Sequence, residues 1–352
     1  MSFELTIEPL GQTIGIEEGQ TLLDAALRAG IYLPHACCHG LCATCKVQVA
    51  DGEVEHGEAS SFALMDFERD EGKCLACCAT AQSDLVIEAE IDEDPDAENL
   101  PVQDLSGVVS RIETLTPTIK GVWIRLDAPI RFQAGQYVNL NLPGGIGSRA
   151  FSLASPPSAS GEVELNIRSV PGGQGTAYVH EKLQVGERIG ISGPYGRFFV
   201  KKSARMPVLF MAGGSGLSSP RSMILDLLEE GFALPITLIY GQRQRDELYY
   251  HDEFVALAAQ HPVAASSGLG RQCGTHRRAS GRRCFRSAIR PAHLSAAPAQ
   301  AALLPASRPG AAHGAEWRCP ARPPPRRHRR GQCTAWRLRS WSRSTSGQAP
   351  QG

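Results

Sequence analysis

Four cysteines between residues 37 and 77 constrain this chain more than any other feature of its sequence. They are spaced Cys37-x4-Cys42-x2-Cys45, and Cys77 follows after 31 further residues. Seven of the 11 cysteines lie between Cys37 and Cys78, and the other four follow residue 270. The opening stretch MSFELTIEPLG has neither a basic head nor an apolar signal core, so we expect a cytoplasmic protein with no membrane association. Clustered cysteines in such a chain argue for a metal or redox site rather than a disulfide framework.

The spacing is that of plant-type ferredoxins and predicts a [2Fe–2S] cluster. The predicted thiolate ligands are Cys37, Cys42, Cys45 and Cys77. A zinc site is an alternative, although zinc favours CxxC pairs, and only Cys42/Cys45 and Cys74/Cys77 form such pairs. Small buried thiols without a metal are a further alternative. Because Cys38 and Cys78 adjoin two of the proposed ligands, an assignment shifted by one residue also stays open. His39 is interpreted as a loop residue, since Rieske chemistry needs two histidines.

The segments around these cysteines predict a small sheet with one helix. Residues 6–19 alternate like a hairpin, and residues 46–57 and 84–91 have strand patterns. Residues 21–30 place apolar side chains on one helical face, with Thr21 as a cap and Gly30 as a stop. We therefore expect a β-grasp [2Fe–2S] ferredoxin domain of α+β type over residues 1–93.

The next part of the chain combines an acidic segment with a run of strand signals. Residues 88–98, EAEIDEDPDAE, carry seven acids and a proline, which predicts a solvated acidic linker over residues 94–103. An acidic docking surface for an electron-transfer partner is the alternative. Residues 107–127 and 132–144 alternate and are interrupted by proline and glycine. These patterns predict an antiparallel β domain over residues 104–204.

Two further glycine-rich turns are typical of phosphate-binding loops. GGQGTAYVHEKL, residues 172–183, leads into a helix start, where unpaired N–H groups suit a phosphate. Arg149 could meet a pyrophosphate as a fork, although a lone arginine is as often a surface charge. Residues 207–243 read strand, glycine turn, helix, strand, which is a βαβ unit. We therefore expect a partial α/β NAD(P)-binding domain over residues 205–262.

Two of these segments resemble signatures of the ferredoxin–NADP⁺ reductase superfamily. RAFSLASPP, from residue 149, is similar to its Arg-x-Tyr/Phe-Ser-x-x-Ser/Thr-Pro motif, and GGSGLSSP, from residue 213, to its Gly-Gly-Ser/Thr-Gly-x-x-x-Pro motif. The resemblance implies FAD contacts at Arg149, Phe151, Ser152, Arg168, Gly172, Gly173, Gly175 and Thr176. It implies nicotinamide-nucleotide contacts at Gly213, Gly214, Ser215 and Gly216, and an adenosine side flanked by Tyr240, Gly241 and Arg243.

The order of the three domains resembles the reductase components of bacterial multicomponent phenol hydroxylases, over about residues 1–262. The family passes electrons from NADH, through FAD and the cluster, to a separate diiron hydroxylase. NADPH is the less expected donor. Hydride transfer to flavin requires no protein acid or base, so no catalytic residue is predicted. The reductase of another oxygenase, such as a methane, toluene or benzoate system, is an alternative. An iron–sulfur electron carrier with an inactive nicotinamide half is another.

The resemblance stops near residue 262, where the composition changes abruptly. From Val263 the chain has 17 Arg, no Lys and one acid, Glu316, which gives a charge of +16 against −16 for the first 262 residues. The family's Cys-Gly-Pro-Pro segment beside the nicotinamide is missing from the sequence. Residues 263–352 are predicted to be disordered, because they cannot bury enough apolar surface. A frameshifted translation of GC-rich DNA explains a domain that stops in mid-fold. A basic arm for nucleic acid or anionic lipid does not explain it, and we expect no nucleic-acid partner.

Overall fold

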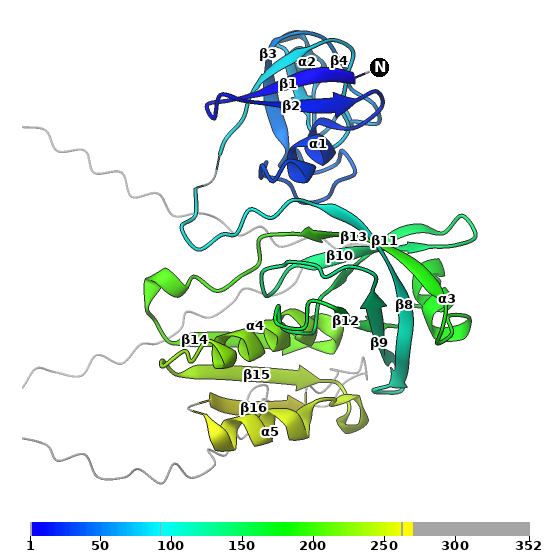
Figure 1. Ribbon diagram of the computed structural model, residues 1–352, viewed down its shortest axis with the longest axis vertical. Helices are drawn as coiled ribbons and strands as arrows, with labels where there is room; N and C mark the ends of the chain where they lie inside the picture. Colours follow the sequence, from blue (N-terminus) through cyan, green and yellow to red (C-terminus); the bar gives the residue numbers. More distant parts are fainter. Residues whose placement is uncertain (1, 92, 262, 270–352) are drawn as a thin grey trace, which may run out of the picture. The chain divides into compact units, whose positions relative to one another are not determined.

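The computed structural model describes residues 2–91, 93–261 and 263–269 (Figure 1). Three successive folding regions follow one another along the chain, and each has its own buried apolar cluster. Within the described part of the chain, no helix has both the length and the apolar character needed to cross a membrane. The predicted tail beyond residue 269 lies outside the described residues.

The first region is a five-stranded sheet with one main helix, as the sequence predicts. Its strand order is β2-β1-β7-β3-β5, with β1 and β7 parallel and the other pairs antiparallel. The helix α1 packs its apolar face into the same core as β1 and β7. The elements are β1 (Ser2–Glu8), β2 (Gln12–Glu17), α1 (Leu22–Arg28), β3 (Lys46–Asp51), β4 (Val54–Glu55), α2 (Asp66–Asp70), β5 (Lys73–Leu75), β6 (Thr80–Ala81) and β7 (Leu85–Glu88).

The ends of α1 follow from the residues that flank it. Thr21 is the N-cap, and its hydroxyl accepts a hydrogen bond from the backbone N–H of Asp24 at 3.2 Å. Asp24 in the first turn and Arg28 in the last turn suit the helix dipole and form an ion pair at 2.9 Å. Gly30 adopts a left-handed φ of 76°, which allows the chain to turn away after the last turn. The predicted cap and stop of this helix are confirmed.

The second region is an antiparallel six-stranded sheet with the order β11-β10-β13-β8-β9-β12. Its two edge strands meet through an isolated bridge between Leu153 and Leu165, so the sheet curls toward a barrel. Inward-facing Val, Ile and Leu side chains from most of these strands form the core. The elements are β8 (Gln103–Thr114), β9 (Ile119–Leu126), β10 (Tyr137–Leu142), β11 (Gly147–Ser152), β12 (Glu162–Arg168), α3 (Gln174–Glu181) and β13 (Arg188–Tyr195).

The third region is a parallel three-stranded sheet, β14-β15-β16, whose strands lie side by side in Figure 1. Side chains of β14, α4 and β15, among them Phe210, Leu227 and Leu238, form its core. The elements are η1 (Lys202–Ala204), β14 (Val208–Gly213), η2 (Gly214–Leu217), α4 (Ser218–Glu229), β15 (Ile236–Gln242), η3 (Arg245–Glu247), α5 (His251–Gln260) and β16 (Val263–Leu269). This is the predicted βαβ arrangement, extended by one further helix and strand.

The strand β16 corrects the predicted end of the ordered chain. The composition predicts disorder from Val263 onward, whereas residues 263–269 form a strand that pairs with β15 along its whole length. The segment VAASSGL consists mostly of small residues and has little apolar alternation, so its sequence gives a weak strand signal. The strand forms because the N–H and C=O groups at the edge of β15 form a hydrogen-bond ladder with β16.

One face of the third sheet is apolar and exposed. On β14, Leu209 and Met211 are 58% and 74% exposed, and Ile239 on β15 is 41% exposed. These side chains alternate with the buried Phe210 and Leu238, which belong to the core shared with α4. Parallel sheets are normally covered on both faces. The exposed face therefore agrees with the prediction of an α/β domain that is only partly built.

The acidic segment before the barrel is held by contacts rather than fully solvated. Asp94 forms an ion pair with Lys201 at 2.7 Å, and this pair lowers the pKa of the Asp94 carboxyl. Asp96 accepts hydrogen bonds from the backbone N–H and the hydroxyl of Ser203. The side chain of Gln133 donates to the carbonyl of Asp96 at 2.6 Å. These acids tie the linker to the segment that leaves the barrel, which a purely solvated spacer would not require.

Candidate cofactor sites

The loop around the first three cysteines is shaped by left-handed backbone conformations. Cys38, Gly40 and Ala43 have φ values of 54°, 69° and 61°. A Cβ at Gly40 would lie 2.8 Å from Cys78 Sγ and 3.0 Å from Glu58 O, so a larger residue does not fit there. This turn directs backbone N–H groups inward, as anion-binding nests do.

The inward N–H groups already reach a sulfur atom. The backbone N–H groups of His39 and Leu41 both donate to Cys37 Sγ at 3.4 Å. Hydrogen bonds of this kind stabilise a thiolate and, in a cluster, tune its reduction potential. The small residues Gly40 and Ala43 allow this close approach of the loop backbone to the sulfur.

The four predicted ligands lie near one another in this part of the fold. Cys37 affects the pKa of Cys42, and Cys45 and Cys77 affect each other's pKa. The Sγ atoms of Cys77 and Cys78 lie 3.6 Å apart. A zinc ion would need four ligands around one point. Over the described ranges, no three His, Cys, Asp or Glu side chains converge so closely on a single position.

The pKa directions differ among the cysteines. Hydrogen bonds from Thr44 lower the pKa of Cys42 to about 6. A hydrogen bond from Cys45 lowers the pKa of Cys77 to about 5, and the proton stays on Cys45, whose pKa is raised. Burial raises the pKa values of the three spare thiols, to about 11 for Cys38 and about 12 for Cys74 and Cys78. Two of the predicted ligands, Cys42 and Cys77, therefore ionise more readily than the spare thiols beside the loop.

The two predicted flavin motifs meet at the start of α3. A Cβ on Gly175, in the first turn of α3, would lie 2.9 Å from Arg149 Cγ and 3.1 Å from Leu142 Cδ1. No side chain caps the helix, so its first N–H groups stay available beside the arginine. The Thr176 hydroxyl is used within the turn, where it accepts from the backbone N–H of Val170 at 3.1 Å.

The remaining residues of the flavin prediction line the same strand or turn. Arg149, Phe151 and Ser152 all belong to β11, and Gly172 and Gly173 precede α3, with a φ of 76° at Gly172. A guanidinium next to a free helix N-terminus is suited to a pyrophosphate, through charge and N–H groups together. The residues present at this site therefore fit the pyrophosphate of FAD.

A cavity of about 660 Å³ joins the cysteine loop to the flavin strand. Its walls include Cys37 and Cys77 on one side, and Tyr137, Arg149 and Tyr195 on the other. The rings of Tyr137 and Tyr195 are stacked with centroids 5.5 Å apart. Burial raises the pKa of Tyr137 to about 12, so its hydroxyl stays protonated at neutral pH. The cavity thus brings two of the predicted cluster ligands, Cys37 and Cys77, to the strand that carries the flavin motif.

The nucleotide turn, residues 213–216, follows β14, and a residue that was predicted to contact FAD lies beside it. Gly214 has a φ of 58°, and its N–H donates to Gln242 Oε1 at 3.3 Å. Arg168, which was assigned to FAD, lies beside this turn, because a Cβ on Gly214 would be 2.8 Å from Arg168 Nη1. Ser215 and Gly216 belong to the 3-10 turn η2, which leads directly into α4. A positive side chain, flexible glycines and a helix N-terminus together fit a nucleotide phosphate.

One predicted nucleotide contact is wrong. Tyr240 was expected to flank the adenosine, but it is only 2% exposed and belongs to the core of the third region. Its hydroxyl accepts a hydrogen bond from Gln242 Nε2 at 2.8 Å. The alternation of β15 explains the position, because residues 236, 238 and 240 all face the buried side. Arg243 remains exposed.

The sequence analysis also missed a buried ionic cluster between the barrel and α4. Glu164 and Arg221 have side chains only 5% and 13% exposed, and they form an ion pair at 2.9 Å. The available signal was a charged residue inside the apolar strand VELNI, since a buried glutamate needs a partner. Nothing in the sequence pattern identified Arg221 as that partner.

Comparison with known proteins agrees with this sequence of sites. Residues 5–82 match the family of 2Fe-2S iron-sulfur cluster binding domains, residues 107–200 match oxidoreductase FAD-binding domains, and residues 210–271 match oxidoreductase NAD-binding domains. The chain is 61% identical over 262 residues to the reductase component of phenol 2-monooxygenase from Pseudomonas sp. (strain CF600). A phenol hydroxylase protein from Acinetobacter pittii (strain PHEA-2) is 58% identical over 262 residues. Each alignment covers 74% of both chains. The chain belongs to the iron–sulfur flavoprotein reductase family that contains these two proteins.

A solved structure of the reductase family supports the same assignment. The crystal structure of the Amycolatopsis reductase GcoB matches with a TM-score of 0.70 and 32% identity, and covers 76% of this chain and 81% of that chain. Membership of this reductase family confirms the predicted fold class and the predicted cofactors, which are a [2Fe–2S] cluster, FAD and NADH. The chain is an NAD(P)H-dependent flavin iron–sulfur oxidoreductase. About a quarter of each chain lies outside the alignments to the two phenol hydroxylase proteins.

Proposed function

We propose that the chain is the reductase component of a multicomponent phenol hydroxylase and delivers electrons to the oxygenase component of that system. The names and identities of the two phenol hydroxylase relatives support this assignment. We also propose that the oxygenase component is a diiron hydroxylase, as the family resemblance implies. A reducing cytoplasmic location suits a site that depends on free thiolates.

The observation that carries the proposal is the cavity shared by Cys37, Cys77 and Arg149. When bound, FAD accepts a hydride from NADH as an electron pair, and the cluster carries single electrons. Arg149 and the first turn of α3 would hold the pyrophosphate, while Phe151 and Ser152 would line the flavin ring. Cys37, Cys42, Cys45 and Cys77 would hold the cluster, with Cys37 and Cys77 on the flavin side.

The nucleotide side of the proposal involves the turn from Gly213 to Gly216. Gly213 and Gly214 let the backbone approach a pyrophosphate, and Ser215 with the N–H groups at the start of α4 would bind it. Arg168 would add a positive charge to the same turn. We propose the domain limits of the sequence analysis with one change, namely that the nucleotide-binding part extends to residue 269 because of β16.

An apolar surface beside the exposed end of the cysteine loop is our proposed docking site for the oxygenase component. Cys42 is exposed, Leu41 is 67% exposed and Phe62 is 92% exposed. The backbone N–H of Ser60 donates to the carbonyl of Gly40 at 3.1 Å, which fixes the loop of Phe62 against the cysteine loop. An exposed apolar patch of this kind marks an interaction site. The flavin side of the cluster site faces the cavity, so the Cys42 side is left for the outgoing electron.

The relay is tested by an anaerobic NADH titration of the purified holoprotein, followed by visible absorption. We expect NADH to bleach both the flavin and the cluster bands. If only dithionite bleaches them, the cofactors are bound but the nicotinamide half does not deliver a hydride. That result would refute the reductase assignment and favour the alternative of an iron–sulfur carrier.

The docking surface is tested with the Phe62→Ala variant and the oxygenase component of a phenol hydroxylase. We expect about a tenfold loss of NADH-driven phenol hydroxylation, because truncating an aromatic interface anchor removes about 1–2 kcal/mol or more of binding. Ferricyanide reduction by NADH should not change. Val185→Ala is the matched control, since Val185 is an apolar residue on the barrel with 59% exposure. An equal loss of NADH-driven phenol hydroxylation in both variants would count against a docking site at Phe62.

A further inference from the structure

A single buried arginine joins four parts of the fold. Arg221 lies in the first turns of α4, directly after the nucleotide turn. Its Nη1 donates to the carbonyl of Ala154 at 2.8 Å and to Glu164 Oε2 at 2.9 Å. Its Nε and Nη2 donate to the two carboxylate oxygens of Glu253, both at 2.9 Å. The guanidinium also lies 4.3 Å over the ring of Tyr250. All three guanidinium nitrogens therefore donate hydrogen bonds, in a fixed planar geometry that a lysine cannot reproduce.

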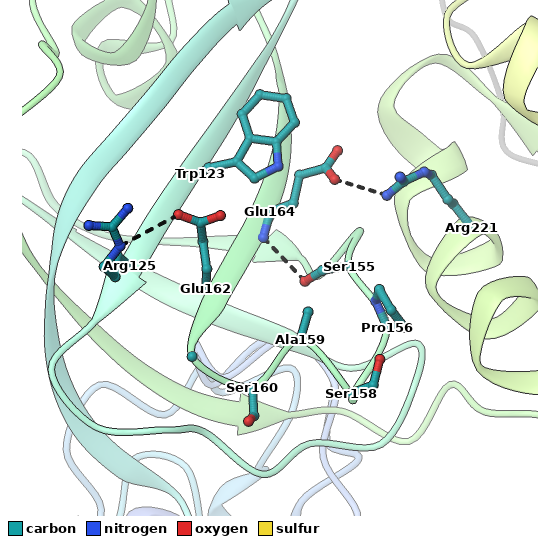
Figure 2. Close-up of a pocket in the computed structure, with 11 residues that line it drawn as sticks. Trp123, Arg125, Ser155, Pro156, Ser158, Ala159, Ser160, Glu162, Glu164 and Arg221 are labelled. Carbon is teal, nitrogen blue, oxygen red and sulfur yellow. Dashed lines mark hydrogen bonds and ion pairs between the residues drawn. The ribbon is translucent and has the colours of Figure 1, made fainter. Parts of the chain in front are cut away.

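The contacts of Arg221 lie close to both proposed cofactor sites. Ala154 follows the flavin strand β11 by two residues, and its N–H donates to the carbonyl of Glu164 at 2.8 Å. Figure 2 shows the Glu164 carboxylate directed at Arg221 and the Glu164 backbone N–H directed at Ser155. The Tyr250 hydroxyl donates to the other oxygen of Glu164. One guanidinium thus connects the end of the flavin strand, the strand β12, the phosphate helix α4 and the start of α5.

Burial alone would lower the pKa of Arg221, but the hydrogen bond to Glu253 and the charges of Glu164 and Glu253 raise it. The side chain therefore stays charged, and both carboxylates keep a partner. Buried ions persist only where their charges and hydrogen bonds are matched in this way. The ionic group of Arg221, Glu164 and Glu253 therefore has one defined arrangement, which suits it to fixing the relative positions of the elements that carry these residues.

Among the described residues, other polar contacts also join the barrel to the third region, and none of them involves β11. The Ser219 hydroxyl donates to the carbonyl of Gly135 at 3.3 Å. The hydroxyls of Thr116 and Thr118 donate to Glu247 at 3.2 and 2.7 Å, and the Tyr250 hydroxyl lies 3.4 Å from Asn166 Oδ1. These contacts help to hold the two regions together, whereas Arg221 bonds α4 to Ala154, close to the end of β11.

We propose that Arg221 is a positioning residue for hydride transfer, which fixes the nucleotide-binding turn at the correct distance and angle from the flavin strand. The inference rests on the proposed function, since it concerns the NADH and FAD sites. Hydride transfer needs the donor carbon of the nicotinamide and the acceptor nitrogen of the flavin in close, aligned contact, and a displacement of about 1 Å can reduce the rate about a hundredfold. Arg221 touches no substrate and acts only through the elements that it holds.

The test compares Arg221→Met with Arg188→Met in the cofactor-loaded protein. Arg188 pairs with Asp127, and both side chains are more than half exposed, so its loss removes only a surface ion pair. For Arg221→Met we expect about a tenfold or larger drop in the rate of NADH oxidation, with little change in KM. The isotope effect with NADH deuterated at C4 should rise, because hydride transfer becomes the slow step. FAD content and reduction of the cluster by dithionite should match those of the unaltered protein.

A second readout does not depend on activity. Hydrogen exchange should accelerate in residues 162–168 and 218–229 of Arg221→Met, and neither segment should change in Arg188→Met. Arg221→Lys should recover only part of the rate, since a single ammonium group cannot reach Ala154 and both oxygens of Glu253. If Arg221→Met fails to fold, Glu253→Gln is the substitute, because it keeps the shape of the site. It should change the rate, the isotope effect and the hydrogen exchange in the same directions, with smaller magnitudes.

The outcomes separate this inference from the proposed function. If the unaltered chain does not oxidise NADH, the proposed function fails, while the exchange measurement still decides whether Arg221 holds β12 and α4 together. Unchanged exchange in Arg221→Met would overturn the inference in either case. If the isotope effect is unchanged, and the rate and KM change only in proportion to the FAD content, the role of Arg221 is purely structural. That result would also overturn the inference.

Discussion

The substitution Gly175→Ala isolates the contribution of Arg149 to flavin binding. Gly175 is buried in the first turn of α3, and an added Cβ would lie 2.9 Å from Arg149 Cγ and 3.1 Å from Leu142 Cδ1. Both distances are shorter than ordinary carbon–carbon contacts of about 3.5–4.0 Å. Either Arg149 or α3 must move, and the long arginine side chain moves more easily than a helix packed on the barrel.

The magnitudes predict weaker FAD binding, together with a loss of stability that ranges from none to a comparable size. Replacing glycine by alanine in a helix stabilises the fold by about 0.5–1 kcal/mol. Crowding of Arg149 and Leu142 costs about 1–3 kcal/mol, so the net change in stability is roughly 0–2.5 kcal/mol. A charge-assisted hydrogen bond contributes about 1.5–3 kcal/mol. Losing that bond to the pyrophosphate would weaken FAD binding about 10- to 150-fold.

FAD affinity is measured by the quenching of flavin fluorescence on adding apoprotein, and stability by thermal unfolding of the same apoprotein. Gly161→Ala is the matched control, because no heavy atom lies within 4 Å of the Cβ that it would add. Arg149→Met should weaken binding to a similar degree, and the double variant Gly175→Ala with Arg149→Met should be no weaker than Arg149→Met alone. Wild-type FAD affinity in Gly175→Ala, or full additivity in the double variant, would refute the reasoning.

Three further predictions concern the cluster, the barrel and pH. Cys77→Ser should abolish the visible absorption of the cluster, whereas Cys78→Ser should keep it; the reverse result would show that the assignment is shifted by one residue. Gly135→Ala should destabilise the protein by about 2–4 kcal/mol in thermal unfolding, because the new Cβ would lie 1.9 Å from Phe198 O at a φ of 102°. Burial, followed by the charge of Arg69, lowers the pKa of His56 below 6.5, so below pH 6.5 the unfolded state binds the proton more readily and stability falls. In urea unfolding between pH 7.5 and 5, the free energy of unfolding of His56→Gln should lose this part of its pH dependence. If the free energy changes with pH as in the unaltered protein, His56 is not the group responsible.

The predictions from sequence succeeded where a local pattern carries the chemistry. The hairpin of β1 and β2 and the cap of α1 were predicted because alternation and capping act over a few residues. The [2Fe–2S] cofactor was predicted from the spacing of four cysteines, because a cluster needs its ligands at particular spacings along the loop. The family matches confirm the cofactors. The individual site residues remain predictions, supported by the contacts of Arg149 and Cys37.

The predictions from sequence failed where a partner elsewhere in the chain decides the outcome. The strand β16 forms because β15 offers an edge, and its own residues give little sign of it. Tyr240 was assigned to a nucleotide site, yet the alternation of β15 directs it into the core. Arg168 lies beside Gly214 because β12 ends next to η2, a proximity that no spacing along the chain predicts.

The sequence by itself determined the cofactor chemistry, the order of the three regions and the break in composition after the nucleotide half begins. Thiolate spacing, glycine turns and apolar periodicity are local properties, and local properties survive in the linear sequence. Only the tertiary structure decided that the flavin strand shares a cavity with Cys37 and Cys77, and that Arg221 joins β12 to α4. These are contacts between residues tens of positions apart, and they exist only after apolar burial has brought the strands and helices together.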